Sequence, residues 1–113
     1  MTRKYLPLER KSLTHRFKLG NQKGYITIGF YEDGTPGELF IKLSKVGSSS
    51  RVLYDTIGIL TSIALQNGVP PHEITGKLKR VSSEASGIVN GVFYTSVIDY
   101  IFSYLETKCQ NYF

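Results

Sequence analysis

Apolar and polar residues alternate along the first part of the chain, as they do in half-buried β-strands. In residues 12–20, one face carries Leu13, His15, Phe17 and Leu19. Residues 25–31 also alternate, and an Asp33-Gly34 pair, typical of a tight hairpin turn, separates them from a third alternating run at 39–43. The pattern predicts three strands joined by short turns in an antiparallel meander.

After Gly47 the apolar residues recur at the three- and four-residue spacing of a helix. We expect its buried face to comprise Val52, Leu53, Thr56, Ile57, Leu60, Ile63, Ala64 and Leu65. Gly68 and the Pro70-Pro71 pair predict its end, because glycine accepts the left-handed stop conformation and proline cannot continue a helix.

Two further helices are predicted, over about residues 71–80 and about 93–108, with a polar loop at 82–91 between them. The order predicts an α+β fold, a three-stranded antiparallel meander followed by three helices packed on one sheet face. Residues 1–11 show no period and predict a basic N-terminal arm, which leaves 12–113 as a single domain.

Composition limits the chemistry of the chain. With 113 residues, 41% of them apolar, the chain can form a core without disulfides or metal. The single cysteine, Cys109, excludes an internal disulfide, and the two scattered histidines, His15 and His72, make no convincing zinc site. We expect no cofactor.

The segment 52–65 is too short to cross a bilayer, and no signal peptide is apparent. We therefore expect a cytoplasmic protein without a membrane partner.

Positive charge is concentrated near the N-terminus. The net charge is +5, and residues 1–23 hold seven of the 14 Lys and Arg residues but one acid, Glu9. Such a segment indicates an anionic partner, and a basic, solubilising edge is the alternative interpretation.

The junction at "GSSS" (Gly47–Ser50) joins the third strand to the first helix. A helix start has unpaired N–H groups, which a serine can cap or an anion can bind. Cations there oppose the helix dipole and favour a negative ligand. We therefore predict an anion site formed by Lys45, Gly47, Ser48, Ser49, Ser50 and Arg51.

The sheet face opposite the predicted core would carry aromatic and basic residues. We predict that it exposes Tyr25, Tyr31, Thr27, Phe40, Arg16 and Lys18. This composition suits either the stacking of bases or packing against another subunit. His15 joins the predicted site, although a histidine on the apolar face of a strand is more often a satisfied core or pocket residue.

Four segments of the chain resemble a known module. They are "SLTHRF", "GYITIGFYEDGTPGELFI", "TIGILTSIALQNGVP" and "SVIDYIFSYL". In order and spacing, over about residues 5–105, they resemble the C-terminal TSCPD-type domain of adenosylcobalamin-dependent class II ribonucleotide reductases. The catalytic barrel, radical cysteine and redox cysteine pair of that family have no counterpart here. The resemblance therefore implies a fold and a nucleotide setting, and we expect no enzyme activity.

Three functions follow from these patterns. The first is a non-catalytic binding module for a nucleotide-like anionic ligand, either an effector nucleotide or, in a virus, a nucleotide second messenger sequestered against host defence. The second is an accessory protein-interaction or assembly domain related to ribonucleotide reductase, with that enzyme as partner and no ligand. The third is nucleic-acid binding through the basic N-terminal segment. We expect self-association, as a dimer or higher oligomer, alongside the first.

Overall fold

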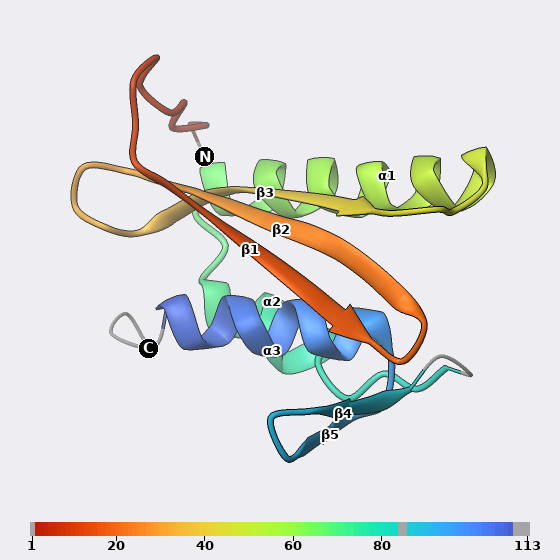
Figure 1. Ribbon diagram of the computed structural model, residues 1–113. Helices are drawn as coiled ribbons and strands as arrows, with labels where there is room; N and C mark the ends of the chain where they lie inside the picture. The colour runs from red at the N-terminus through yellow and green to blue at the C-terminus, as the bar shows by residue number, and fades with distance from the viewer. Residues whose placement is uncertain (1, 84–85, 110–113) are drawn as a thin grey trace.

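The computed structural model describes residues 2–83 and 86–109. Its elements are β1 (Ser12–Leu19), β2 (Gln22–Phe30), β3 (Pro36–Leu43), α1 (Ser48–Gln66), α2 (Pro71–Leu78), β4 (Gly87–Val89), β5 (Val92–Tyr94) and α3 (Val97–Cys109). The first three strands form one antiparallel sheet in the order β1-β2-β3 (Figure 1). The predicted meander and the α+β class are therefore confirmed.

One face of this sheet forms the core together with α3. The strands contribute Phe17, Leu19, Ile26, Ile28, Leu39, Ile41 and Leu43. From α3 come Val97, Tyr100, Ile101, Phe102, Leu105 and Cys109. The alternation read from the sequence thus assigns these strand residues to the correct face. The shorter helix α2 packs on α3 (Figure 1).

Helix α1 runs along the free edge of β3. Gly58 allows the close approach, because a Cβ atom there would lie 2.8 Å from the Leu39 carbonyl oxygen. The Ser62 hydroxyl accepts a hydrogen bond from the Leu39 N–H (2.9 Å) and lies 3.3 Å from the Leu39 carbonyl oxygen. An edge strand otherwise presents unpaired backbone groups, so α1 protects this edge within the same chain.

The predicted burial of α1 is largely wrong. Its buried residues are Gly58, Thr61, Leu65 and Gln66, which face the sheet or the N-terminal arm. Val52, Leu53, Leu60 and Ile63, which were expected inside, are exposed. The helical spacing is real, and Leu65 and Ile57 do face inward, but Gly58 and Ser62 make the close contact with the strand while the other large apolar residues face outward.

The predicted polar loop at 82–91 and the start of the third helix also need correction. Gly87–Val89 and Val92–Tyr94 pair as a two-stranded hairpin, and α3 begins at Val97 rather than near residue 93. The turn is Asn90-Gly91, whose φ angles are 50° and 80°. Asn-Gly is the residue pair that this tight turn favours, so the sequence carried the signal. Residues 84–85 of the predicted loop lie outside the described residues.

The N-terminal segment lies against α1 and the sheet. The Lys4 N–H donates to the Gln66 carbonyl (2.7 Å), and Arg3 Nε donates to Gln66 Oε1 (2.8 Å). Among the described residues, none of the helices combines the length and apolar character needed to cross a membrane.

A candidate anion-binding face

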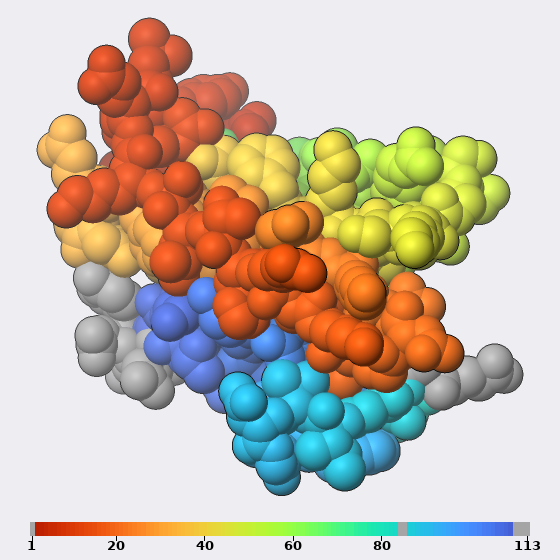
Figure 2. All heavy atoms as spheres, viewed as in Figure 1, coloured from red at the N-terminus to blue at the C-terminus, as the bar shows by residue number. Residues whose placement is uncertain are grey.

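The second face of the sheet carries a cross-strand row of cations around a tyrosine. Tyr25 of β2 is paired in register with Arg16 of β1 and with Lys42 of β3. All three side chains are exposed, and Tyr25 is 44% accessible. Figure 2 shows the atoms of these strands, orange to yellow, at the surface between α1 and α3. The row is therefore open to a ligand from solvent.

More positive charge lies at the end of the same face. Lys18 and Lys23 are register partners, and the Ser44 N–H donates to the Lys23 carbonyl (2.8 Å). This bond places Lys45, the next residue, near the start of β2. The ion pairs Arg10–Glu38, Lys79–Glu106 and Arg80–Asp99 include none of these lysines, nor Arg16, Lys42 or Lys45. We call Arg16, Lys18, Tyr25, Lys23, Lys42 and Lys45 the basic face.

A second aromatic residue continues this face. Phe40 is paired with Thr27 and is 55% exposed, one diagonal step from Tyr25. Side chains at diagonal cross-strand positions are about 7–8 Å apart at their Cα atoms, within reach of aromatic rings. Lys23 and Lys42 were absent from the predicted site. The alternation of β3 places Lys42 on the same face as Phe40, so the sequence could have indicated it.

The start of α1 has the features expected of an open helix end. Gly47 is the N-cap residue, and no side chain caps it. Ser48, Ser49 and Ser50 are exposed, and the first backbone bond runs from the Arg51 N–H to the Gly47 carbonyl (3.1 Å). The N–H groups of the three serines therefore have no acceptor within the helix. The first turn holds no acidic residue.

Lys45 precedes this helix start in the sequence, and Arg51 lies in its first turn. Lys45 adopts a φ of 58°, and its side chain is exposed. The Arg51 guanidinium lies 3.5 Å from the Val46 carbonyl oxygen and is exposed as well. The predicted cations thus stay near the helix start, while Arg51 contacts the chain that leads into it.

His15 lies apart from the other predicted site residues. Its ring faces α3, where Nε2 is 2.7 Å from the Tyr100 hydroxyl and the ring stacks on Tyr104 at 4.2 Å between centroids. Burial, with a smaller effect of the Lys108 charge, lowers the His15 pKa. Because Arg16 and Lys18 point the opposite way, the structure does not bring His15 to the basic face.

Tyr31 is buried rather than exposed with Tyr25, so this part of the predicted aromatic face is wrong. The register shifts between Gly29 and Phe30, and Tyr31 is 8% accessible. Its hydroxyl donates to the Lys4 carbonyl. The N-terminal segment therefore covers this ring, which no local sequence pattern indicated.

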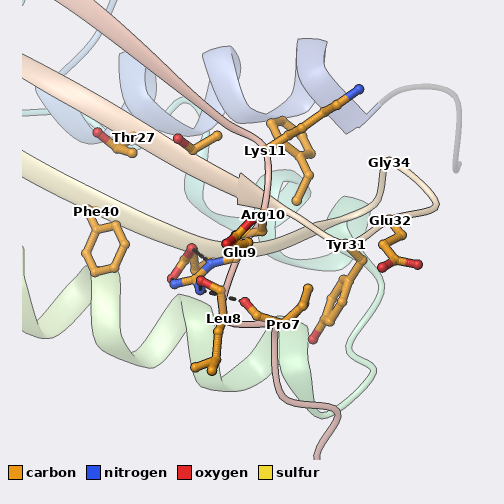
Figure 3. Close-up of a pocket in the computed structure, with 13 residues that line it drawn as sticks. Pro7, Leu8, Glu9, Arg10, Lys11, Thr27, Tyr31, Glu32, Gly34 and Phe40 are labelled. Atoms are coloured by element: carbon orange, nitrogen blue, oxygen red, sulfur yellow. Dashed lines mark hydrogen bonds and ion pairs between the residues drawn. The ribbon is translucent and has the colours of Figure 1, made fainter.

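A groove of about 960 Å³ separates residues 7–12 from the far end of the same face (Figure 3). Phe40 lies at one end of it and Tyr31 at the other. Between them Arg10 binds Glu38 through two contacts, Nε to Oε2 at 2.5 Å and Nη2 to Oε1 at 3.0 Å. Arg10 is already paired, so the further positive charge in the groove comes from Lys11, an exposed residue that also lines it.

Cys109 is the single cysteine of the chain. Cys109 is fully buried, and burial, assisted by the charge of Glu106, raises the pKa of its thiol to about 12. A reactive cysteine requires an accessible thiolate, which these surroundings disfavour. Within residues 2–83 and 86–109, no group of three His, Cys, Asp or Glu side chains could hold a metal ion.

Comparison with known proteins gives a consistent match. Residues 1–108 match the TSCPD domain family. The chain is 40% identical over 106 residues to a vitamin B12-dependent ribonucleotide reductase of Rhodopirellula baltica, covering 91% of this chain and 10% of that protein. Reductases of the same name from Streptantibioticus cattleyicolor and Bradyrhizobium diazoefficiens are 36% and 33% identical, over 88% and 98% of this chain.

These relatives are much longer than the chain. It spans 17% of the Streptantibioticus reductase and 9% of the Bradyrhizobium reductase. No solved structure matches the chain.

Proposed function

Because the chain belongs to the TSCPD domain family, we propose that it is a non-catalytic binding module for a nucleotide-like anionic ligand. The family relates it to a region of ribonucleotide reductases that makes up about a tenth of the Rhodopirellula protein. The ligand would be an effector nucleotide or a nucleotide second messenger.

The observation that supports this proposal is the row Arg16–Tyr25–Lys42 on the open sheet face. A base can stack on an exposed aromatic ring, and a phosphate can bind the cations on either side. Lys45 and the open start of α1 would supply further donors for phosphate oxygens. The Tyr25 ring without neighbouring cations would fit any apolar partner. Arg16 and Lys42 without an aromatic ring between them would fit any anion.

The proposal is tested by titrating the chain, in low salt, with nucleoside mono-, di- and triphosphates, cyclic dinucleotides and inorganic phosphate. We expect calorimetry to detect at least one nucleotide binding more tightly than phosphate. Tyr25→Ser should weaken the binding of that nucleotide by about 5- to 150-fold, since base stacking contributes roughly 1–3 kcal/mol. Tyr25→Phe should keep most of the affinity.

The charges are tested with Arg16→Ala and Lys42→Ala, each expected to weaken binding about tenfold or more. Lys77→Ala removes an exposed cation from α2 and serves as the matched control. If no nucleotide binds at millimolar concentration, or if phosphate alone binds as well as every nucleotide, the proposal is wrong.

Single-stranded nucleic acid is a second candidate ligand. Arg16, Lys18 and Lys23, all from the basic N-terminal part of the sequence, lie on the same side of the sheet as two exposed aromatic rings. A strand that crosses this face would contact several cations, and its affinity would fall steeply with salt. A much steeper salt dependence for a short oligonucleotide than for a mononucleotide would favour this candidate.

A further inference from the structure

Helix α1 presents a continuous apolar surface to solvent. Opposite the residues that contact the sheet, it exposes Val52 (61%), Leu53 (62%), Ile59 (58%), Leu60 (61%) and Ile63 (39%). We call these five residues the α1 stripe. On a helix they fall on one side, together with Thr56, because they follow each other at three- and four-residue intervals. A surface helix normally turns such a side toward the core.

We propose that the α1 stripe binds the α1 stripe of a second copy of this chain, with the two helices antiparallel about a two-fold axis. Leu53, Thr56, Leu60 and Ile63 alternate by three and four residues, which is the spacing of a coiled-coil seam. With the axis near residue 58, Leu53 of each copy lies level with Ile63 of the other, and Thr56 lies level with Leu60. The outer layers then pair Leu53 with Ile63, and each inner layer packs Leu60 of one copy against Thr56 of the other.

Burial of this surface would leave no polar side chain without a partner. The one hydroxyl in the seam, on Thr56, already donates to the Val52 carbonyl (2.8 Å). Arg51 and Asp55, the charged residues of α1, lie beside the stripe rather than on it. An antiparallel pair also sets each helix start near the other's end, which favours the alignment of the helix dipoles. Two copies can therefore meet without unsatisfied groups or like-charge repulsion.

The area is sufficient for a dimer. Five side chains of this size, about 40–60% exposed, present on the order of 500 Å² of apolar surface. This is at the upper end of the range for the largest apolar patch on a monomeric protein. Two such surfaces bury about 1,000 Å², the lower limit for a specific interface, before neighbouring side chains are included.

The composition of α1 favours a second copy over a lipid surface. Helices that lie on membranes are rich in Lys and Arg on their polar side, whereas α1 carries one cation, Arg51, and one acid, Asp55. The α1 stripe shares no residue with the basic face. The dimer and the ligand site can therefore be tested separately.

The oligomeric state of the full chain, measured by sedimentation velocity from about 1 to 100 µM, tests the proposal. We expect a monomer–dimer equilibrium. Leu60→Asp, in the middle of the seam, should shift the dissociation constant by at least 100-fold toward monomer. Ile88→Asp makes the same change at a residue of the β4–β5 hairpin that is 69% exposed, and it should leave the equilibrium unchanged.

A charge exchange tests the antiparallel arrangement. Leu53→Glu and Ile63→Lys should each weaken the dimer, and the double variant should recover at least tenfold of the lost affinity, because each new glutamate then faces a lysine of the other copy. Circular dichroism verifies that each variant stays folded. A wild-type chain that is monomeric at 100 µM overturns the proposal. So does a dimer that Leu60→Asp leaves intact, or a stripe that binds only a reductase chain.

Discussion

Asp99 is a fully buried carboxylate that joins three segments of the chain. Its two oxygens accept hydrogen bonds from the Arg80 N–H (2.6 Å), the Thr95 N–H (2.8 Å) and the Ser103 hydroxyl (3.0 Å). Its own N–H donates to the Ser96 hydroxyl (2.8 Å), which caps the start of α3. One side chain thereby connects the end of α2, the β4–β5 hairpin and α3.

These bonds set the protonation of Asp99. Burial by itself would raise the pKa, but the hydrogen bonds from Thr95, Arg80 and Ser103 outweigh it, and the pKa is lowered. A carboxyl whose pKa is lower in the folded state stabilises the protein above its unfolded value of about 3.9. The contribution is lost as the pH falls through the lower folded pKa.

We expect Asp99→Asn to lower the free energy of unfolding by about 2–3 kcal/mol at pH 7, because an amide nitrogen cannot accept the hydrogen bonds of the replaced oxygen. Urea denaturation measures the loss. The difference from wild type should be constant between pH 5 and 8 and should shrink below about pH 4. Asp55→Asn, at an exposed position of α1, is the control. A difference of the same size at pH 3 and pH 7 would contradict this account.

At the scale of elements, the contact between α1 and β3 depends on small residues. Gly58 brings the helix backbone against Leu39, and Ser62 bonds to the edge of the strand. A larger residue at position 58 would push the helix away from the edge that it covers. Among the apolar residues of α1, Leu65 is buried and Tyr54 and Ile57 pack against the core, whereas Val52, Leu53, Ile59, Leu60 and Ile63 are exposed.

Gly58→Ala should therefore destabilise the protein by roughly 1–2 kcal/mol, although alanine is the better helix former, because its Cβ would overlap the Leu39 carbonyl. Gly76 is the matched control. It lies in α2 with nothing within 4 Å of an added Cβ, so Gly76→Ala should stabilise by about 0.5–1 kcal/mol. Thermal and urea unfolding measure both effects. Stabilisation by both substitutions would show that α1 does not approach β3 this closely.

At the scale of the whole molecule, the N-terminal segment connects parts that are distant in the sequence. The Gln66 side chain donates to the Gly37 carbonyl (2.9 Å) and accepts from Arg3, while Arg10 pairs with the buried Glu38. The segment thus links the end of α1 to the sheet and covers Tyr31. It contributes no element to the sheet, yet it determines which residues of the open face reach solvent.

Removing residues 1–10 should lower the Tm by on the order of 5 °C, because Gln66 and Glu38 would lose their partners. Differential scanning calorimetry measures the shift. Arg10→Ala alone should cause part of this decrease in Tm, because it leaves the Glu38 carboxylate without its cation. Hydrogen exchange should increase near Gln66 in the shortened chain. An unchanged Tm would mean that the segment lies on the surface without stabilising it.

Part of the candidate site could be predicted from the sequence. The alternation of β1 and β2 correctly placed Arg16 and Tyr25 on the face away from the core. Tyr31 was misplaced because the strand register shifts between Gly29 and Phe30, which breaks the period. Ligand binding at Lys45 and Arg51 stays a prediction, although both lie at the helix start as expected.

The sequence by itself determined the strand meander, the α+β order of elements and the family of the chain, since periodicity and turn residues act between neighbours in the chain. Only the tertiary structure decided that α1 covers a sheet edge and turns its apolar residues outward. It also decided that Tyr31 is covered and that Asp99 joins three segments. These outcomes depend on contacts between distant residues, such as Ser62 with Leu39, 23 positions apart. A local pattern shows that a face is apolar, but the rest of the fold decides what covers it.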